Sequence, residues 1–289
     1  MNPTSDQTSA GGDDVPPTAA AAESSIAPRT TVGSSCRFVV TGFGPFCGVP
    51  DNPTSELVRS FRDSAEVGGA VLESHVMETS AEHVRAEIDG IYGRLKSASD
   101  DRVGGDGNIS NDDARRDGGV VTVVLHLGVD YNATRFKLER CAYNDATFRV
   151  PDERGYLPNH ECISLIREEG DDDDKSETSS HEWGKCVETT LDLDDICGQL
   201  QNHNEAVVVS GDPGRFVCNY TYYLSLSRCR SINDEVFKNK HNDSGGKNAL
   251  LRHHALFVHV PPFDVVPKRR QLDFILRVME TIERHVSEV

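Results

Sequence analysis

The sequence has little positive charge and no long apolar run, and each deficit argues against a class of protein. Its 30 lysines and arginines stand against 47 aspartates and glutamates, which gives a formal net charge of −17. This balance argues against a nucleic-acid partner, because such a partner requires a basic face. No apolar run approaches the roughly 20 residues of a membrane-spanning helix. We therefore expect neither a membrane segment nor a membrane partner.

Paired cysteines are also missing. The eight cysteines show no C-x-x-C spacing, which argues against a zinc site, and we expect neither a metal nor another cofactor. In a chain of 289 residues such cysteines are typical of free thiols in a reducing compartment. The first residues show neither the apolar core of a signal peptide nor the arginines of a transit peptide. We therefore expect a cytoplasmic protein.

Four segments have too little apolar content to fold. Hydrophobic residues make up only 37% of the chain, which is low for a fully globular protein. Residues 1–35 are rich in Ala, Ser, Thr, Pro and Asp, and we expect a disordered tail there. Polar stretches at about 97–118, 168–185 and 230–247 are predicted to be loop insertions. They would interrupt a single domain that spans 36–289.

The rest of the chain alternates between strand-like and helix-like segments. Strands are predicted at 37–41, 70–77, 120–127, 206–209 and 255–260, with further short strands between 131 and 150. Helices are predicted at about 53–62, 80–96, 191–201, 220–227 and 268–289. This alternation favours an α/β fold, a three-layer α/β/α sandwich around a central, largely parallel but mixed twisted sheet. Active sites of such folds lie at the carboxyl ends of the strands.

One stretch, Gly211–Tyr220, lies where a predicted strand gives way to a predicted helix. Enzymes often place a nucleophile at such a junction, and Cys218 lies there. Backbone amides and the positive end of a helix dipole favour a thiolate at positions of this kind. Two helix starts are open, one at Asp212–Pro213 and one nearer Cys218. The alternative is a core cysteine without chemistry.

A cysteine nucleophile needs a base, and the base needs a group that orients it. His259 lies near the carboxyl end of an apolar strand, so it is either that base or a core histidine. His253–His254 precedes the same strand, and we expect it to be solvated. Glu139 is a candidate orienting acid, but it could instead be a surface acid paired with Lys137 or Arg140. Spacing alone does not select it over its neighbours.

Four segments together form a pattern that is more specific than any single residue. They are Val40–Phe46 with Asn52–Pro53, Leu138–Asp152, Gly214–Asn219 with Tyr222–Tyr223, and Phe257–Pro262. These segments resemble the pyroglutamyl-peptidase I family, cysteine peptidases that remove an N-terminal pyroglutamate. The order Glu, Cys, His is that of the family, and the resemblance covers most of residues 37–285 apart from the three insertions. It implies a phosphorylase/hydrolase-like α/β/α fold.

The resemblance implies a role for each member of the catalytic set. Cys218 would attack the carbonyl that joins pyroglutamate to the next residue. His259 would protonate the leaving amine and then activate water against the thioester, while Glu139 would hold the imidazole in place. The backbone amide of Cys218 and the guanidinium of Arg149 are candidates for stabilising the oxyanion. Arg149 could instead form a salt bridge with a neighbouring aspartate.

The substrate ring sets the requirements for a pocket. Pyroglutamate is a neutral, flat lactam, so it needs aromatic or aliphatic walls and one or two amide hydrogen bonds. Seven positions match pocket positions of the family: Phe43, Phe46, Asn52, Arg149, Val150, Phe216 and Val217. The first two match ring-holding aromatics. Ordinary core packing explains Val150 and Val217 equally well, and helix capping explains Asn52 equally well.

Two positions depart from the family pattern. Cys47 stands where many members have glycine, and Asp130 stands where bacterial members tend to carry glutamine. With these departures noted, we predict a cysteine exopeptidase acting on peptides with an N-terminal pyroglutamate. The alternative is a catalytically inactive protein of the same fold that serves as a binding or scaffold protein, and a metal-dependent hydrolase is a third hypothesis. The sequence does not determine the oligomeric state.

Overall fold

The structure of the protein is a computed structural model. The residues that the structure describes are 36–46, 52–63, 70–103, 121–164, 183–240 and 253–288. The predicted tail at 1–35 lies outside these residues, as do Cys47 and a part of each predicted insertion. The division of the chain into a tail and a single domain with insertions therefore stays a prediction.

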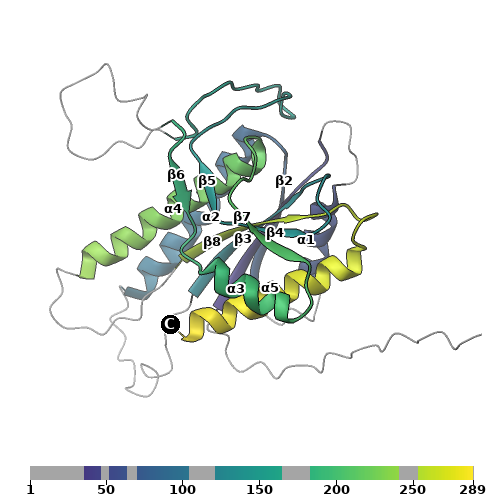
Figure 1. Ribbon diagram of the computed structural model, residues 1–289. Coiled ribbons are helices and arrows are strands. Elements are labelled where there is room, and N and C mark those ends of the chain that lie inside the picture. The colour runs from purple at the N-terminus through teal and green to yellow at the C-terminus, as the bar shows by residue number, and fades with distance from the viewer. Residues whose placement is uncertain are drawn as a thin grey trace, which may run out of the picture. The chain divides into compact units, whose positions relative to one another are not determined.

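Eight strands and five helices form within these residues (Figure 1). The strands are β1 (Cys36–Phe43), β2 (Val71–Met77), β3 (Val121–Val129), β4 (Phe136–Glu139), β5 (Cys141–Tyr143), β6 (Cys186–Glu188), β7 (Val207–Ser210) and β8 (His253–Val260). The helices are α1 (Pro53–Asp63), α2 (Ala81–Val103), α3 (Leu193–Asn202), α4 (Val217–Lys240) and α5 (Lys268–Glu288). Each strand and helix predicted outside the 131–150 region has its counterpart here.

Six strands form one mixed sheet in the order β2-β1-β3-β8-β4-β7, while β5 and β6 form a separate two-stranded sheet. β2, β1, β3 and β8 run parallel to one another. β4 and β7 are parallel to each other, but β4 is antiparallel to β8. The predicted mixed and largely parallel sheet is confirmed, and the strand before Cys218 runs against the strand that carries His259.

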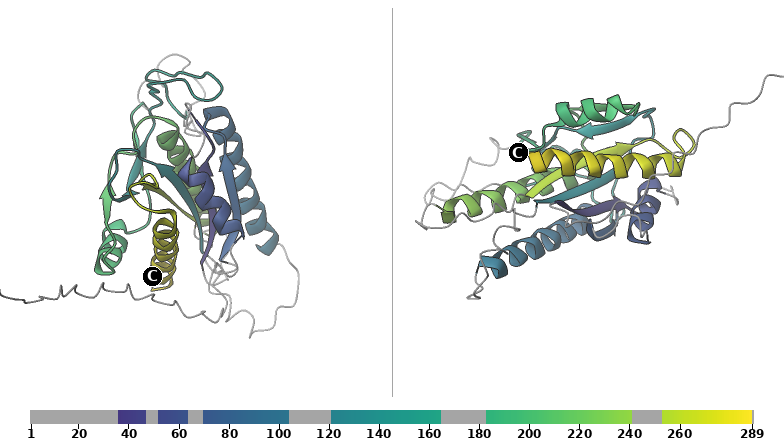
Figure 2. Two further views of the ribbon diagram at one scale, coloured as in Figure 1. Left: turned by 90° about the vertical axis from the view of Figure 1, so that its right-hand side faces the viewer. Right: turned by 90° about the horizontal axis from the view of Figure 1, so that it is seen from below.

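Helices cover both faces of the six-stranded sheet (Figure 2). On one face, α2 and α4 pack against each other and bury Ile88 and Tyr222 with Phe257 of β8. On the other face, α1, α3 and α5 bury side chains such as Leu57 and Phe274 against the strands. Both interfaces remove apolar side chains from water, which is the main favourable contribution to folding. The predicted three-layer α/β/α architecture is confirmed.

Two helices extend further than predicted. α2 continues through Val103 and α4 through Lys240, into stretches predicted to be loop insertions. In α4, Ile232 is buried, so the apolar side of the helix continues beyond the predicted end. In α2, the hydroxyl of Ser97 donates a hydrogen bond of 3.1 Å to the carbonyl of Gly93, a bond compatible with a polar, exposed helical turn. Polar composition alone therefore underestimated both helices.

The prediction that both His253 and His254 are solvated is wrong for His253. It is the first residue of β8, is 2% exposed and pairs with Thr122 of β3. Its N–H donates to Asn233 Oδ1 (3.1 Å), and its carbonyl accepts from the Nδ2 of the same residue (2.9 Å). Burial lowers the pKa of His253 to about 4. This histidine is consequently neutral at ordinary pH.

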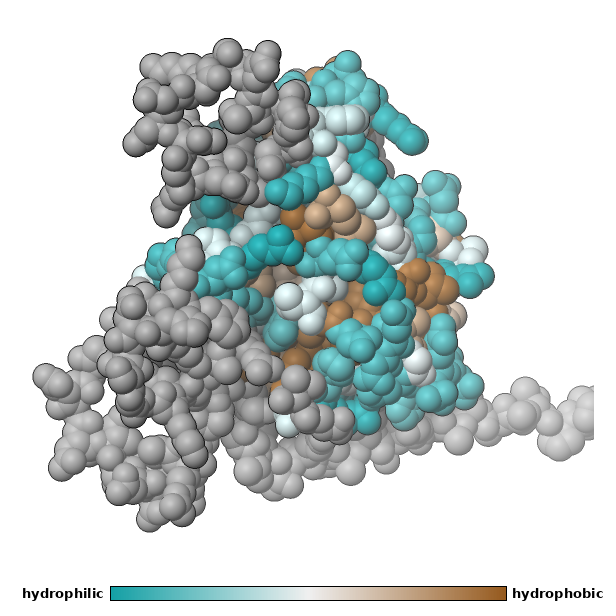
Figure 3. Space-filling model, turned by 60° about the vertical axis from the view of Figure 1, so that its left-hand side comes forward, coloured by the Kyte–Doolittle hydropathy of each residue, from teal (hydrophilic) through white to brown (hydrophobic). Residues whose placement is uncertain are grey.

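The surface of the described part is mainly hydrophilic. On the face shown in Figure 3, hydrophobic residues form small patches between hydrophilic ones. The large apolar side chains that are most exposed include Tyr131, Val150, Tyr156, Leu157 and Trp183. No helix among the described residues is both long enough and apolar enough to cross a membrane.

Candidate active site

The segment between β7 and α4 places Cys218 in the first turn of a helix. Gly214 adopts φ +80°, a conformation that favours glycine, and its N–H donates to Asp212 Oδ1 (3.1 Å). α4 then begins at Val217, so the later of the two possible helix starts is the one observed. The first N–H groups of a helix have no partner within it. Cys218 thus lies beside free backbone donors, with its side chain only partly buried.

His259 and Glu139 meet on the face of the sheet that α4 covers. His259 Nδ1 lies 2.8 Å from Glu139 Oε1. In the antiparallel pairing of β4 and β8, Glu139 stands opposite Phe257, two residues before His259. Side chains two residues apart share one face of a strand, so the Glu139 carboxylate reaches the His259 imidazole diagonally across the face of the sheet. Glu139 is fully buried and His259 is nearly so.

His259 is also within hydrogen-bonding reach of Cys218. Burial alone would lower the pKa of His259, but hydrogen bonds to Cys218 and Glu139, together with the negative charge of both groups, raise it to about 10. The imidazole is therefore held in its protonated form at neutral pH. A protonated imidazole beside a thiol favours the thiolate, which is the attacking species. The three groups from distant parts of the sequence converge on one point.

Two polar side chains of α4 hold this arrangement in place, and neither is among the predicted site residues, although both belong to a segment that carries the family resemblance. The hydroxyl of Tyr222 donates a hydrogen bond to the carbonyl of Glu139 (2.9 Å). Asn219 accepts from the N–H of Tyr143 (2.8 Å) and donates to the carbonyls of Tyr143 (2.9 Å) and Asp145 (3.0 Å). Asn219 is fully buried next to the nucleophile. Its position directly after Cys218 was the available signal.

Gly128 allows the sulfur and the core to approach β3 closely. A Cβ at this position would lie 2.6 Å from Phe257 Cε1 and 3.2 Å from Cys218 Sγ. The first distance is far below an ordinary carbon–carbon contact of roughly 3.5–4.0 Å. The glycine that ends the third predicted strand is therefore required by the packing around Cys218.

Phe46 and Phe216 form the aromatic part of the site. Their ring centroids are 6.2 Å apart, and Phe216 lies 4.8 Å from Phe148 in an edge-on arrangement. Phe216 is two residues before Cys218, and both side chains pack against the core on the α4 side of the sheet. Tyr131, which was not predicted as a site residue, has its ring 6.4 Å from that of Phe46.

Three of the other predicted pocket residues are buried in the structure. Phe43 and Val217 belong to the core on the α4 side of the sheet, and the Phe43 ring lies 6.4 Å from that of Phe257. Asn52 accepts the N–H of Thr54 (3.1 Å), as a helix cap does, and donates to the carbonyl of Gly44 (3.0 Å). Asn52 therefore fixes the turn that leads to Phe46.

Arg149 and Val150 are exposed on the turn after Phe148. The salt bridge considered for Arg149 is taken by another arginine, because Asp145 pairs with Arg215 at 3.2 Å. Asp152 instead accepts the N–H of Ala81 at the start of α2 (2.8 Å). The structure thus brings Cys218, His259 and Glu139 together, pairs the rings of Phe46 and Phe216, and places Arg149 at the surface.

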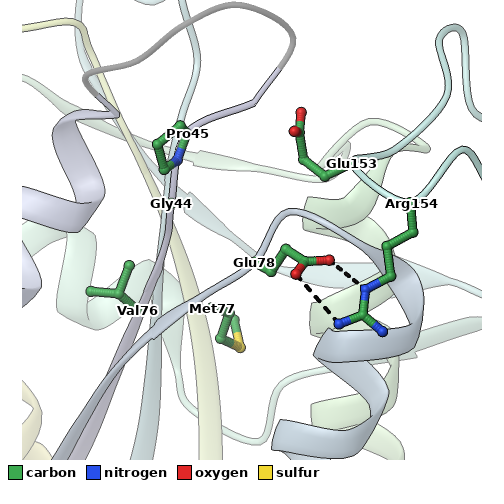
Figure 4. A pocket seen from close by; sticks show the side chains of 7 residues that line it. All are labelled: Gly44, Pro45, Val76, Met77, Glu78, Glu153 and Arg154. Atoms are coloured by element: carbon green, nitrogen blue, oxygen red, sulfur yellow. Dashed lines mark hydrogen bonds and ion pairs between the residues drawn. The ribbon is translucent and has the colours of Figure 1, made fainter.

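A charged hollow of about 450 Å³ lies beside the site, at the ends of β1 and β2. It is lined by Gly44, Pro45, Val76, Met77, Glu78, Glu153 and Arg154. Figure 4 shows Glu78 and Arg154 facing each other, and their closest atoms are 2.6 Å apart. Since this ion pair suits a neutral ring poorly, the aromatic group beside Cys218 is the better candidate for a lactam. Among the described residues, no cluster of His, Cys, Asp or Glu could hold a metal ion.

Comparison with known sequences identifies similar proteins, although no family model matches the chain. Pyroglutamyl-peptidase 1 of Rattus norvegicus is 27% identical over 159 residues, which cover 54% of this chain and 57% of the relative. Pyrrolidone-carboxylate peptidase of Thermococcus litoralis is 23% identical over 190 residues, which cover 66% of this chain and 68% of the relative. The chain thus spans little more than half of the length of the rat relative.

Comparison with solved structures extends the similarity to nearly the whole fold. A mutant pyrrolidone carboxyl peptidase from Pyrococcus furiosus matches with a TM-score of 0.57 and 19% identity, covering 88% of this chain and 99% of that one. The pyrrolidone carboxyl peptidase of Fervidobacterium islandicum AW-1 matches with a TM-score of 0.57 and 18% identity, covering 86% and 99%. At such identities the likeness establishes the fold. The resemblance to the pyroglutamyl-peptidases that the four sequence segments indicate is thus confirmed, by similar sequences and by similar structures.

Proposed function

We propose that this chain is a cysteine peptidase, a pyroglutamyl-peptidase I, that hydrolyses the amide bond after an N-terminal pyroglutamyl residue. The observation that carries the proposal is the position of His259, within hydrogen-bonding reach of Cys218 and 2.8 Å from Glu139. The similarity to pyroglutamyl-peptidases supports the choice of substrate. Nothing within the described residues favours an inactive scaffold.

The first chemical step forms a thioester. The thiolate of Cys218 attacks the carbonyl carbon of pyroglutamate, and the electron pair of the carbonyl moves to the oxygen. The backbone N–H of Cys218, in the first turn of α4, is suited to stabilise that oxyanion. The tetrahedral intermediate collapses as the carbon–nitrogen bond breaks, and His259 gives its proton to the departing amine. Removal of one hydrogen-bond donor to the oxyanion typically reduces the rate by about 10²–10³-fold.

The second step releases pyroglutamate. His259, now neutral, accepts a proton from water while the water oxygen attacks the thioester carbon. The carbon–sulfur bond then breaks, and the thiolate of Cys218 reforms beside a protonated imidazole. Glu139 holds Nδ1 in both steps, so Nε2 is the nitrogen that exchanges the proton. The carboxylate also stabilises the imidazolium, an effect worth orders of magnitude in comparable triads.

The substrate ring fits the aromatic group beside the nucleophile. We place the lactam ring against the flat apolar surfaces of Phe46 and Phe216, the second of which is two residues before Cys218. Phe43, Val217 and Asn52 support this wall from the core rather than through exposed surface. A cytoplasmic location is part of the proposal. It is supported by the cysteines within the described residues, which are all free thiols.

The direct test is the release of a fluorescent amine from a pyroglutamyl amide under reducing conditions. We expect turnover by the wild type and none by Cys218→Ser, whereas Cys186→Ser, which removes an exposed thiol, should retain the wild-type rate. Iodoacetamide should abolish activity and a chelator should leave it intact. A wild type without turnover, or a fully active Cys218→Ser variant, would reject the proposal.

A further inference from the structure

The turn after β3 is bonded to the end of the strand that carries His259, and it presents an exposed aromatic side chain. The N–H of Asp130 donates to the carbonyl of Val260, directly after His259 (3.0 Å). Burial would raise the pKa of Asp130, but the hydrogen bond and charge of Lys137, the N–H of Asn132 and the charge of His259 together lower it. Tyr131 follows in the chain, and its side chain is 44% exposed. This ring has no assigned role in the proposed reaction.

The turn that carries this ring is fixed by several contacts. Lys137 Nζ lies 2.6 Å from Asp130 Oδ2, and the N–H of Asn132 donates to Asp130 Oδ1 (3.0 Å). Lys137 stands directly opposite His259 in the pairing of β4 with β8. The charge of Asp130 is therefore balanced locally, and the open feature of the turn is the tyrosine ring. A ring held in advance loses little conformational entropy when it contacts a ligand.

The course of the reaction decides which part of the substrate meets this ring. The ring of Phe46 pairs with that of Phe216, two residues before Cys218, and with that of Tyr131, which follows the residue bonded to the strand of His259. The acyl group must lie next to Cys218, because the carbonyl carbon bonds to the sulfur. The departing amine must lie next to His259, because it takes its proton there. The residue after pyroglutamate is thus directed towards the turn at 130–133.

We propose that Tyr131 is a specificity-determining residue that contacts the side chain following pyroglutamate and favours aromatic side chains there. This inference rests on the proposed peptidase function. Stacking between two aromatic rings has a preferred geometry, and its contribution corresponds to roughly a two- to tenfold difference in a rate or binding constant. The preference therefore concerns the leaving part of the peptide and not the pyroglutamyl ring.

The experiment compares kcat/KM for pyroglutamyl-phenylalanine amide and pyroglutamyl-alanine amide in the same enzyme preparation. The ratio of the two values cancels any loss of folded protein. We expect the wild type to prefer the phenylalanine substrate by about two- to tenfold and Tyr131→Phe to retain this ratio. Tyr131→Ala should reduce the ratio to near one. Tyr156→Ala, which removes another exposed tyrosine, should keep the wild-type ratio.

The outcomes separate this inference from the function on which it rests. A wild-type ratio near one would overturn it. So would a Tyr131→Ala variant that keeps the ratio, including one that loses activity equally on both substrates. In each of these cases turnover itself would still support the peptidase. A wild type that cleaves no pyroglutamyl amide would instead remove the proposed function and the inference together.

Discussion

Replacement of Gly128 by alanine tests the packing around the sulfur of Cys218 most directly. The added Cβ would lie 2.6 and 2.7 Å from two carbons of the Phe257 ring and 3.2 Å from Cys218 Sγ. Ordinary contacts of roughly 3.5–4.0 Å require the ring to withdraw by about 1 Å and the sulfur by about half as much. The ring has little room, because Phe257 is fully buried. Aromatic neighbours surround it at Phe43, His126, Tyr222 and His259.

Overpacking of this kind should destabilise the protein. Additional methyl groups in a well-packed core typically cost about 1–3 kcal/mol. For a folded unit of this size the midpoint of thermal unfolding should fall by roughly 2–10 °C. Gly93→Ala and Gly198→Ala are matched controls, because a Cβ at either helical position meets nothing within 4 Å. Each should gain about 0.5–1 kcal/mol, the usual advantage of alanine over glycine in a helix.

The same change should reduce catalysis in the molecules that remain folded. A displacement of about 1 Å at a reacting group typically reduces the rate by roughly 100-fold. We therefore expect Gly128→Ala to lower kcat/KM on a pyroglutamyl amide by one to two orders of magnitude, measured well below its unfolding midpoint. The helical controls should keep the wild-type value. A Gly128→Ala protein with wild-type stability and wild-type turnover would refute the close approach of β3 to the sulfur.

Three further predictions concern the charge on the imidazole, the buried histidines and a helix cap. Glu139→Gln should lower kcat by about 10³–10⁴-fold. It should also move the alkaline limit of the pH–rate profile to lower pH, because the carboxylate helps to raise the pKa of His259. An unshifted profile would argue for a merely structural role of Glu139. Burial lowers the pKa of His126 to about 3 and that of His253 to about 4, from an ordinary value of 6.5. Below pH 6.5 the unfolded chain binds these protons and the folded chain does not. The free energy of unfolding should therefore decrease as the pH is lowered from about 6.5 to 4, by on the order of 1 kcal/mol per histidine and pH unit. Urea denaturation at several pH values measures this slope, and a flat dependence would contradict it. Asp192 accepts the N–H groups of the first turn of α3, so Asp192→Ala should cost about 1 kcal/mol in thermal unfolding; an unchanged midpoint would mean that the cap contributes nothing.

The sequence predicts the elements with strong patterns. The β-branched run of β3 is recognisable without any structure, because a strand covered on both faces reads as nearly continuous apolar sequence. The broad apolar face of α5 predicts a helix for the same kind of reason. β6 has only three residues, Cys186–Glu188, too few to show a period. Its strand character comes from pairing with β5, a contact between distant segments that no local pattern contains.

The direction of β4 could have been predicted from a signal that composition does not carry. Only residues 130–135 connect β3 to β4. A crossover to a parallel strand needs a dozen or more residues, so a connection this short indicates an antiparallel course. The convergence of Glu139 with His259 follows from that reversal and from the register of β4 on β8. Register depends on the neighbouring strand as well as on the chain itself, so spacing alone does not select Glu139 over its neighbours.

The diagonal approach of Glu139 to His259 makes activity depend on the count of residues in a short strand. Side chains of a strand alternate between its two faces, so one inserted residue before Glu139 would rotate the carboxylate towards α5, away from the imidazole. Such a chain would still contain Glu, Cys and His in the right order. Yet its imidazole would lack the carboxylate that contacts Nδ1. A one-residue insertion in this four-residue strand would therefore part Glu139 from His259 while all three residues remained in the sequence.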